Sequence, residues 1–357
     1  MAYITLKTKK LAANFNYLDK LFKKNGIQWA IVTKMLCGNK KYLEEVLKFD
    51  IHQVCDSRVS NLRAIKEIRP DIETIYIKPP AKRAISGIVT YADISVNTEI
   101  ETIKLISAEA KRQNKTHKII IMLELGELRE GIMRDTFVDF YKEVLQLTHI
   151  EVIGVGANLS CLYGVLPNHD KLIQLSLYAQ LIEAKFNKKL SVVSGGSSVT
   201  IPLIFQKLLP KGINHFRVGE TLYLGTDVYH DTPLKKMETD AFTLYSEIIE
   251  LIEKPRIPMG EMGTNLEGKN INFDESLRGK TSYRAIIDIG LLDVEQSHLI
   301  PIDNDISIVG ASSDMFVIDL GENNKQYKVG DLLPFRLDYM GTLRILNSRY
   351  IDKRVQS

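Results

Sequence analysis

The segment WAIVTKMLCGN, residues 29–39, joins a short apolar run to a lysine and a turn. Residues 30–33 are mostly apolar and three of them are β-branched, which is typical of a fully buried parallel strand. Lys34 follows at the carboxyl end of this strand, where β/α folds keep their chemistry. Lysine forms Schiff bases, so this position predicts a reactive amine. The alternative interpretation is a strand-ending lysine that only reaches solvent.

A unit of apolar strand, polar break and amphipathic helix repeats over the first two thirds of the chain. Eight such strands alternating with helices predict a (β/α)8 TIM barrel. An open doubly wound sheet is the alternative, but no glycine-rich dinucleotide fingerprint follows the first strand. After an opening strand at 3–5 and a helix at 10–24, the predicted strands lie at 29–34, 51–56, 73–78, 94–96, 118–125, 151–159, 190–195 and 216–224, with helices near 40–48, 57–68, 81–91, 98–113, 136–147, 169–187 and 198–209.

The pattern changes near residue 230, where helical periodicity gives way to short strands punctuated by Gly and Pro. We therefore expect an N-terminal barrel over 1–230 and a C-terminal all-β domain over 231–357. Residues 253–280 form a long polar loop, and loops of that length are often functional. The strands predicted in this domain lie at 242–251, 284–288, 306–309, 315–320, 332–337 and 343–346.

Composition excludes several classes of protein. The 357 residues carry a net charge of +3 with Lys and Arg spread evenly, which gives no case for a nucleic-acid partner. No run approaches a membrane span, and MAYITLKTKK at the N-terminus lacks the apolar core of a signal peptide. The three cysteines cannot all pair and lack metal-ligand spacing, so we expect a cytoplasmic protein with reduced thiols and no metal site.

The turn SGGSS, residues 194–198, ends the seventh predicted strand and opens a helix. Glycines allow a close backbone approach, a helix N-terminus offers unpaired N–H groups, and serine hydroxyls add donors. Such a turn binds phosphate, and the late strands of these barrels are the usual place for it. The alternative interpretation is a serine N-cap with ordinary turn glycines.

Arg217 lies within the eighth predicted strand, in HFRVGETLYLG. A buried arginine without a partner is costly, so it is expected to face a ligand or an ion pair with a neighbouring strand. Gly219, two positions later, leaves room for a flat ligand. His215 is interpreted as a hydrogen-bonded structural histidine. A Schiff-base lysine, a phosphate site and this arginine together suggest pyridoxal 5′-phosphate (PLP).

The chain resembles the fold-type III PLP enzymes of the alanine racemase family, which pair an N-terminal barrel with a C-terminal β domain. It is most similar to the ornithine racemase and predicted amino-acid racemase branch. The matching segments run through nearly the whole chain in the family's order. They are VTKMLCGN (32–39), VCDSRVSNLR (54–63), LGELREG (125–131), GVGANLSCLYGVLP (154–167), VSGGSS (193–198), INHFRVGETLYLG (213–225) and GASSDMFVIDL (310–320).

The resemblance implies that Lys34 holds PLP in a Schiff base and that Ser197 or Ser198 binds its phosphate. Arg217 would face the pyridine nitrogen, and Arg129 would lie near the phenolic oxygen or the substrate carboxylate. Asn158 takes a ring-side position that is histidine in alanine racemases. The remaining residues expected to complete the cofactor site are Ser194, Gly196, Gly219 and Glu220.

Three departures from the alanine racemase pattern make alanine itself doubtful as the substrate. The run after Lys34 differs, the family's carbamylated lysine corresponds to Met122, and its catalytic tyrosine has no clear counterpart in 253–280. The segment 310–314 resembles one in basic amino-acid decarboxylases that enters the partner subunit's site. There an aspartate meets the distal amine of the substrate.

Asp314 is therefore expected to bind the terminal ammonium of a basic amino acid, with an ordinary β-turn aspartate as the alternative. Serine stands at position 313 where those decarboxylases have cysteine. Racemisation needs an acid–base group on each face of Cα. Lys34 would serve one face, and the candidates for the other are Ser313, Tyr283 and Tyr339.

The resemblance thus implies a homodimeric PLP-dependent racemase acting on ornithine or lysine. The rivals are a decarboxylase on the same scaffold, a non-catalytic PLP-binding protein and a cofactor-free Schiff-base aldolase.

Overall fold

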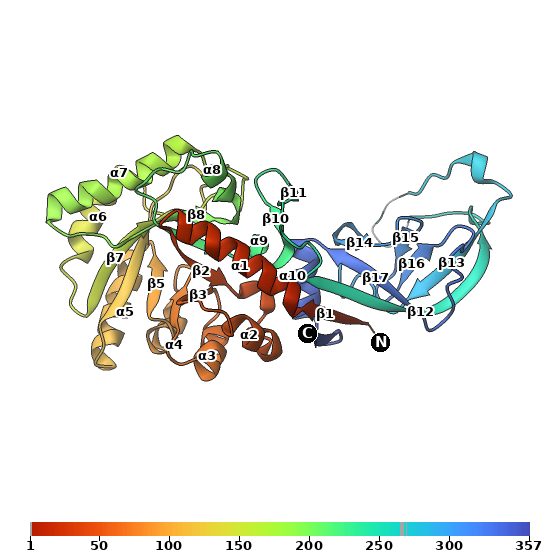
Figure 1. Cartoon of the computed structure of the whole chain (residues 1–357), viewed down its shortest axis with the longest axis horizontal. Coiled ribbons are helices and arrows are strands. Elements are labelled where there is room, and N and C mark those ends of the chain that lie inside the picture. Colours follow the sequence, from red (N-terminus) through yellow and green to blue (C-terminus); the bar gives the residue numbers. More distant parts are fainter. Residues whose placement is uncertain (1, 265–267, 269) are drawn as a thin grey trace. The chain divides into compact units, whose positions relative to one another are not determined.

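A computed structural model describes residues 2–264, 268 and 270–357, which form two compact units (Figure 1). One unit spans 9–239, and the other combines 1–8 with 240–357. Part of the predicted loop 253–280, namely 265–267 and 269, lies outside the described residues. Among the helices in the described ranges, none has the length and apolar character needed to cross a membrane.

The first unit is a closed barrel of eight parallel strands with helices around it, so the open-sheet alternative is wrong and the barrel prediction is confirmed. Each strand pairs with the next in the chain, and the first pairs with the last. The strands are β2 (Gln28–Val32), β3 (Gln53–Asp56), β4 (Glu73–Tyr76), β5 (Ile94–Asn97), β6 (His117–Met122), β7 (Ile150–Gly156), β8 (Val192–Ser197) and β9 (His215–Val218).

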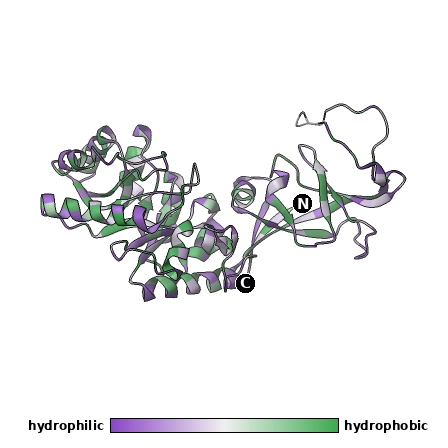
Figure 2. Cartoon of the chain, turned by 90° about the horizontal axis from the view of Figure 1, so that it is seen from above, coloured by the Kyte–Doolittle hydropathy of each residue, from purple (hydrophilic) through white to green (hydrophobic). Residues whose placement is uncertain are grey.

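The helices around the barrel carry both hydrophobic and hydrophilic residues, as the colours of Figure 2 show. In α1, for example, Leu11, Phe15, Leu18 and Phe22 recur at helical spacing and are buried. The helices are α1 (Thr8–Lys24), α2 (Lys40–Leu47), α3 (Val59–Ile68), α4 (Ile85–Tyr91), α5 (Ile100–Arg112), α6 (Phe137–Val144), α7 (His169–Phe186), α8 (Ile201–Phe205) and α9 (Glu220–Leu224), followed by the short strands β10 (Thr226–Asp227) and β11 (Thr232–Pro233).

The last barrel strand is shorter than predicted. The expected strand at 216–224 ends at Val218, and Gly219 caps α9, which begins at Glu220. The apolar run that follows Gly219 is therefore helical. A short apolar run fits a buried strand or a buried helix equally well by periodicity, which explains the error.

The second unit is built on one eight-stranded sheet. Its pairings are antiparallel except for that of β1 with β18. The N-terminal strand thus belongs with the C-terminal sheet. The strands are β1 (Tyr3–Lys7), β12 (Phe242–Pro255), β13 (Thr281–Ile287), β14 (Leu299–Pro301), β15 (Ser307–Ala311), β16 (Phe316–Asp319), β17 (Leu332–Leu337) and β18 (Asp352–Gln356).

One element of this unit is a helix where a strand was predicted. Residues 343–346 lie in α10 (Tyr339–Asn347), and the Asp338 side chain caps its N-terminus by accepting a hydrogen bond from the Gly341 N–H at 2.8 Å. The aspartate at position 338 could have indicated this helix start, since aspartate is a favoured N-cap residue. The unit remains mainly β.

The barrel interior has an apolar middle, because every second residue of each strand points inward. This cluster comprises Ala30, Val32, Cys55, Ile75, Ile94, Val96, Ile120, Met122 and Val192. Met122, at the position of the family's modified lysine, is thus a buried apolar residue.

Candidate active site

Lys34 lies at the carboxyl end of β2, as predicted. It is exposed, and it begins a single 3₁₀ turn, Lys34–Leu36, whose other two residues are buried. Cys37 and Gly38 follow with positive φ of 51° and 73°. A Cβ at position 38 would lie 2.6 Å from Oδ1 of Asn61, so glycine is required there by both conformation and space.

A buried network fixes the residue before Lys34. Thr33 Oγ1 lies 2.7 Å from Asp56 Oδ2, and the other carboxylate oxygen accepts from Asn61 Nδ2 at 3.1 Å and the Arg58 N–H at 2.9 Å. Asp56 is fully buried, and burial raises its pKa although these hydrogen bonds oppose the shift. The ends of β2 and β3 are thereby tied together beneath Lys34.

A cavity of about 390 Å³ opens beside Lys34 within the barrel unit. Lys34 and Arg129 both line it, so the structure brings these two predicted residues together. The cavity also contains two residues that the sequence interpretation missed, Lys78 and Glu130. Lys78 was assigned to the third barrel strand, which in fact ends at Tyr76. The full lining comprises Lys34, Ser57, Ile77, Lys78, Pro79, Arg129 and Glu130.

Arg129 is carried by a closed loop between Leu123 and Ile132, which pair with each other directly. Its guanidinium forms a bidentate ion pair with Glu130. Nε contacts Oε2, and Nη2 lies 2.6 Å from Oε1. Asn158, in the loop after β7, donates its Nδ2 hydrogen to Glu130 Oε1 at 3.1 Å. Glu130 therefore orients two of the predicted cofactor residues, Arg129 and Asn158.

Glu127, in the same loop, holds the segment after β7. Its buried carboxylate accepts five backbone N–H groups at 2.5–3.1 Å. Burial by itself would raise the pKa of Glu127, but these donors outweigh it and lower the pKa to about 2. The donors are the N–H groups of Ser160, Cys161, Leu162, Tyr163 and Val165.

Arg217 is buried near the carboxyl end of β9, and no carboxylate of the described residues lies within ion-pair distance of it. Nη1 donates to Ser194 Oγ at 2.6 Å, and Nη2 donates to the Ala157 carbonyl at 2.9 Å. Burial lowers its pKa. The structural ion pair with a neighbouring strand, which was the alternative interpretation, is therefore not observed in the described part of the chain.

The serine turn is shaped by a β-bulge. Pairing of β8 with β9 shifts between Ser194 and Gly196, which leaves Gly195 as the extra residue. A Cβ on Gly196 would lie 2.1 Å from the Phe216 ring, so packing requires this glycine. Ser194 is buried between Arg217 and His215, and its hydroxyl serves that arginine.

Ser197 is the N-cap of the 3₁₀ turn Ser198–Thr200, as in the N-cap alternative, and Ser198 contacts the start of α9. The Ser197 N–H donates to Thr200 Oγ1 at 3.2 Å, and Ser198 Oγ accepts from the Thr221 N–H at 3.3 Å. Gly219 packs closely on Val32, since a Cβ there would lie 3.2 Å from Val32 Cβ, and Glu220 begins the helix. The predicted phosphate-binding residues of β8 and β9 thus adjoin one another.

The remaining candidates lie in the second unit. Ser313 and Asp314 are exposed in the tight turn between β15 and β16, where Asp314 Oδ1 accepts from the Ser312 and Ser313 hydroxyls at 3.0 and 3.3 Å. Tyr283 lies in β13 and is 36% exposed, and Tyr339 is the first residue of α10. Within this unit Asp314 is a turn residue with a carboxylate open to solvent.

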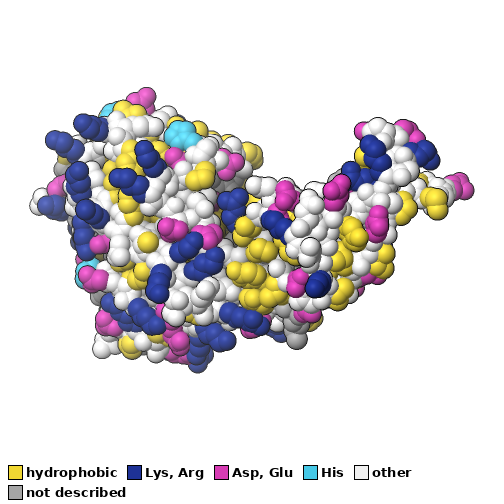
Figure 3. All heavy atoms as spheres, turned by 45° about the vertical axis from the view of Figure 1, so that its right-hand side comes forward, with side chains coloured by type: hydrophobic (Ala, Val, Ile, Leu, Met, Phe, Trp, Pro, Cys, Tyr) yellow, Lys and Arg dark blue, Asp and Glu magenta, His cyan; other side chains and the backbone are white. Residues whose placement is uncertain are grey.

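The barrel residues fit a cofactor that carries an aldehyde, a phosphate and an aromatic nitrogen. Lys34 provides an amine, the turn at 197–198 provides serine hydroxyls, and Arg217 provides a buried cation that forms no ion pair in the described residues, where Glu130 acts on it only through space. A buried cation without an anion is expensive unless something else compensates it. On the face drawn in Figure 3, by contrast, Lys and Arg are scattered among Asp and Glu.

The chain resembles known proteins over nearly its whole length. Residues 6–227 match the family "Alanine racemase, N-terminal domain". The chain is 37% identical to ornithine racemase of Acetoanaerobium sticklandii over 99% of both chains. It is 26% identical to lysine racemase of Thermotoga maritima over 98% of this chain and 97% of that one.

A solved alanine racemase from Bartonella henselae with covalently bound pyridoxal phosphate shares the fold, with a TM-score of 0.75 and 15% identity over 99% of each chain. With the family match spanning the barrel and a relative of this identity spanning the whole chain, the protein belongs to the alanine racemase family.

Proposed function

We propose that the protein is a PLP-dependent amino-acid racemase that interconverts the L and D forms of ornithine, with lysine as the second candidate. The observation that supports this proposal most is the buried guanidinium of Arg217 beside the serine turn, at the barrel end that also bears Lys34. The identity to an ornithine racemase over the full chain supports the substrate.

Residues of the barrel would hold the cofactor. Lys34 would bind the aldehyde carbon through its amine, and the hydroxyls of Ser197 and Ser198 would bind the phosphate together with the backbone at Gly219 and Glu220. Arg129 would bind the phenolic oxygen or the substrate carboxylate, oriented by its bidentate contact with Glu130. Asn158 would lie beside the ring, positioned by the same glutamate.

When bound, PLP supplies an electron sink for the negative charge that develops at Cα of the amino acid. Arg217 would face the ring nitrogen. A guanidinium donates hydrogen bonds and does not give up a proton, so Arg217 would leave that nitrogen unprotonated and the sink weaker. A weaker sink would favour return of a proton to Cα over transamination.

Two groups of the chain would move the proton. Lys34 would remove it from one face of Cα and return it there in the reverse direction. Ser313, Tyr283 and Tyr339 are the candidates for the opposite face. We propose that they reach the site from a second copy of the chain in a homodimer. Asp314 would then bind the terminal ammonium of the substrate, for which its exposed carboxylate in the turn after β15 is suited.

The proposal is tested with purified protein loaded with PLP and incubated separately with L- and D-ornithine. Chiral chromatography should show each enantiomer approaching an equal mixture, and borohydride should fix PLP to Lys34. Release of CO2 without change of configuration would instead identify a decarboxylase. Bound PLP with no turnover of any amino acid would identify a non-catalytic PLP-binding protein. We further expect the protein to be cytoplasmic.

A further inference from the structure

A chain of hydrogen bonds runs along the barrel from Arg217 to the opposite, amino-terminal end of the strands. Arg217 Nη1 lies 2.6 Å from Ser194 Oγ, which lies 2.8 Å from His215 Nδ1. His215 Nε2 lies 3.0 Å from Gln53 Oε1. Gln53 Nε2 donates to Glu73 Oε2 at 2.5 Å, and Lys118 Nζ donates to Glu73 Oε1 at 3.3 Å.

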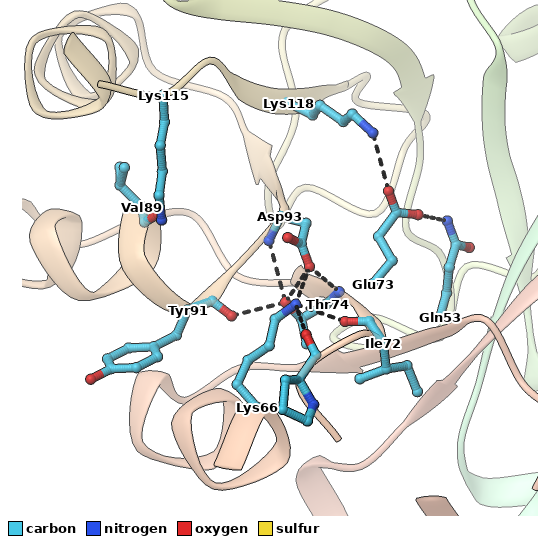
Figure 4. Close-up of polar contacts among 11 residues, drawn as sticks. Gln53, Lys66, Ile72, Glu73, Thr74, Val89, Tyr91, Asp93, Lys115 and Lys118 are labelled. Carbon is cyan, nitrogen blue, oxygen red and sulfur yellow. Dashed lines mark hydrogen bonds and ion pairs between the residues drawn. The ribbon is translucent and has the colours of Figure 1, made fainter. Parts of the chain in front are cut away.

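The order follows from the strand geometry. His215 and Arg217 are two residues apart in β9 and share a face, while Gln53 and Glu73 are register partners at the starts of β3 and β4. Figure 4 shows Glu73 between Lys118 and Gln53 at this end. Burial rises along the chain, from side chains 44% and 31% exposed at Lys118 and Glu73 to the fully buried Ser194.

The partners dictate the direction of every bond. Because Gln53 presents its carbonyl oxygen, His215 Nε2 must carry the hydrogen, and Nδ1 must accept from the Ser194 hydroxyl. That hydroxyl then accepts from Arg217. Burial, reinforced by the positive charge of Arg217, lowers the pKa of His215 to about 3, so the ring is neutral as this direction requires. All the donors thus point from the arginine toward the carboxylate of Glu73.

We infer that Glu73, which also pairs with Lys118, is a distant counter-charge of Arg217, and that His215 and Gln53 are positioning residues that relay its effect to the guanidinium. Aligned hydrogen bonds polarise one another, which strengthens Ser194 as an acceptor for Arg217. The relay adds a hydrogen-bonded link to a carboxylate for a buried guanidinium that makes no ion pair in the described part of the chain, where Glu130 acts on it only through space. This inference rests on the proposed function only where it concerns PLP, because the hydrogen-bond direction is a property of the chain itself.

The first test needs no cofactor. In ¹⁵N NMR spectra of the PLP-free protein, the ring signals of His215 are identified because they disappear in His215→Asn. These signals should be those of the tautomer protonated on Nε2. Gln53→Leu removes the acceptor at Nε2 and should shift the population toward the Nδ1-protonated tautomer, which then donates to Ser194. A wild-type ring protonated on Nδ1, or a ring whose tautomer ignores Gln53→Leu, would overturn the relay.

The second test concerns Arg217. Glu73→Gln removes the charge at nearly constant volume and at a partly exposed position that should tolerate it. We expect this variant and Gln53→Leu to bind PLP about three- to tenfold more weakly by absorbance titration, with kcat reduced and the KM for the amino acid little changed.

Asp93→Asn is the matched control. Asp93 is a lysine-paired carboxylate at the same end of the barrel, but its bonds go to Lys66 and Thr74 and not into the relay (Figure 4). It should bind PLP as the wild type does. If the wild type binds no PLP, the proposed function fails while the tautomer measurement still decides the relay. If the wild type binds PLP and Glu73→Gln binds it equally well, the counter-charge role of Glu73 is wrong.

Discussion

The hydroxyl of Thr33 lies 2.7 Å from the buried carboxylate of Asp56, one residue before the lysine that carries the proposed chemistry. Replacing Asp56 with alanine removes the acceptor of the buried Asn61 amide and of the Arg58 N–H, and it leaves the Thr33 hydroxyl only the Cys55 carbonyl at 3.1 Å. We expect a loss of about 2–4 kcal/mol in the free energy of unfolding and weaker PLP binding. Urea denaturation and absorbance titration measure the two effects, and an unchanged affinity for PLP would remove Asp56 as a support of Lys34.

Asp56 also predicts a dependence of stability on pH. Burial raises its pKa in the folded state, so its stabilising contribution is present below the unfolded pKa and is lost as pH rises through the folded pKa. Asp56→Asn cannot ionise and should lack this loss. Urea denaturation of both proteins between about pH 4 and pH 8 should therefore show the wild type losing stability relative to Asp56→Asn as the pH rises. A constant difference would contradict the buried, proton-binding carboxylate.

Lys34 and Lys78 line the same cavity and allow a matched comparison. Lys34→Arg keeps the positive charge but removes the amine that forms the covalent bond, so we expect loss of the borohydride-reducible adduct and a fall in racemase activity of about 10³-fold or more. Lys78→Arg should keep the adduct. Mass spectrometry of the reduced protein identifies the modified residue, and an adduct that survives Lys34→Arg would refute the assignment.

The sequence predicted the barrel because its signals are local: each strand, break and helix lies within about 30 residues. The sequence also predicted that Arg217 lies in a buried strand. In the described part of the chain, Arg217 forms no ion pair. The relay behind it was not predictable, because His215 lies 162 residues from Gln53 in the chain and meets it only on closure of the barrel.

The errors share a physical cause. Short apolar runs such as 343–346 lack enough length to distinguish helix from strand, and the deciding contact is a cap three or more residues upstream, here at Asp338. Glu130 and Glu127 were missed because both act through loop geometry, one through Arg129 and Asn158 and the other through a set of backbone N–H groups. Neither contact leaves a periodic trace in the sequence.

Asp314 is predicted to select basic substrates. Asp314→Asn removes the negative charge that would face the terminal ammonium while keeping a side chain of the same size in the turn. We expect kcat/KM for ornithine to fall about 10- to 100-fold, and that for a neutral amino acid to change less than about twofold. Asp305→Asn, another exposed aspartate of the same unit, should change neither. Equal losses for ornithine and for a neutral substrate would show that Asp314 supports the fold of the turn and not specificity.

Glu127 is predicted to hold the loop after β7 in place through charge. Its carboxylate accepts five backbone N–H groups, so Glu127→Gln, which offers one oxygen and two unwanted donors, should cost about 1.5–3 kcal/mol in the free energy of unfolding. The amides of residues 160–165 should then exchange hydrogen faster than in the wild type. Glu143→Gln, at an exposed ion pair with Lys104, should change stability by less than about 0.5 kcal/mol.

The pH dependence of this contribution has the opposite sign to that of Asp56. The folded-state pKa of Glu127 is lowered from 4.5 to about 2, so its stabilisation is present above the unfolded pKa and is lost as pH falls toward 2. The stability difference between the wild type and Glu127→Gln should therefore be largest near neutral pH and shrink below about pH 4.5. Hydrogen exchange and urea denaturation at two pH values test it. A difference that grows in acid would mean that Glu127 is protonated in the folded protein and that its five contacts are held by shape alone.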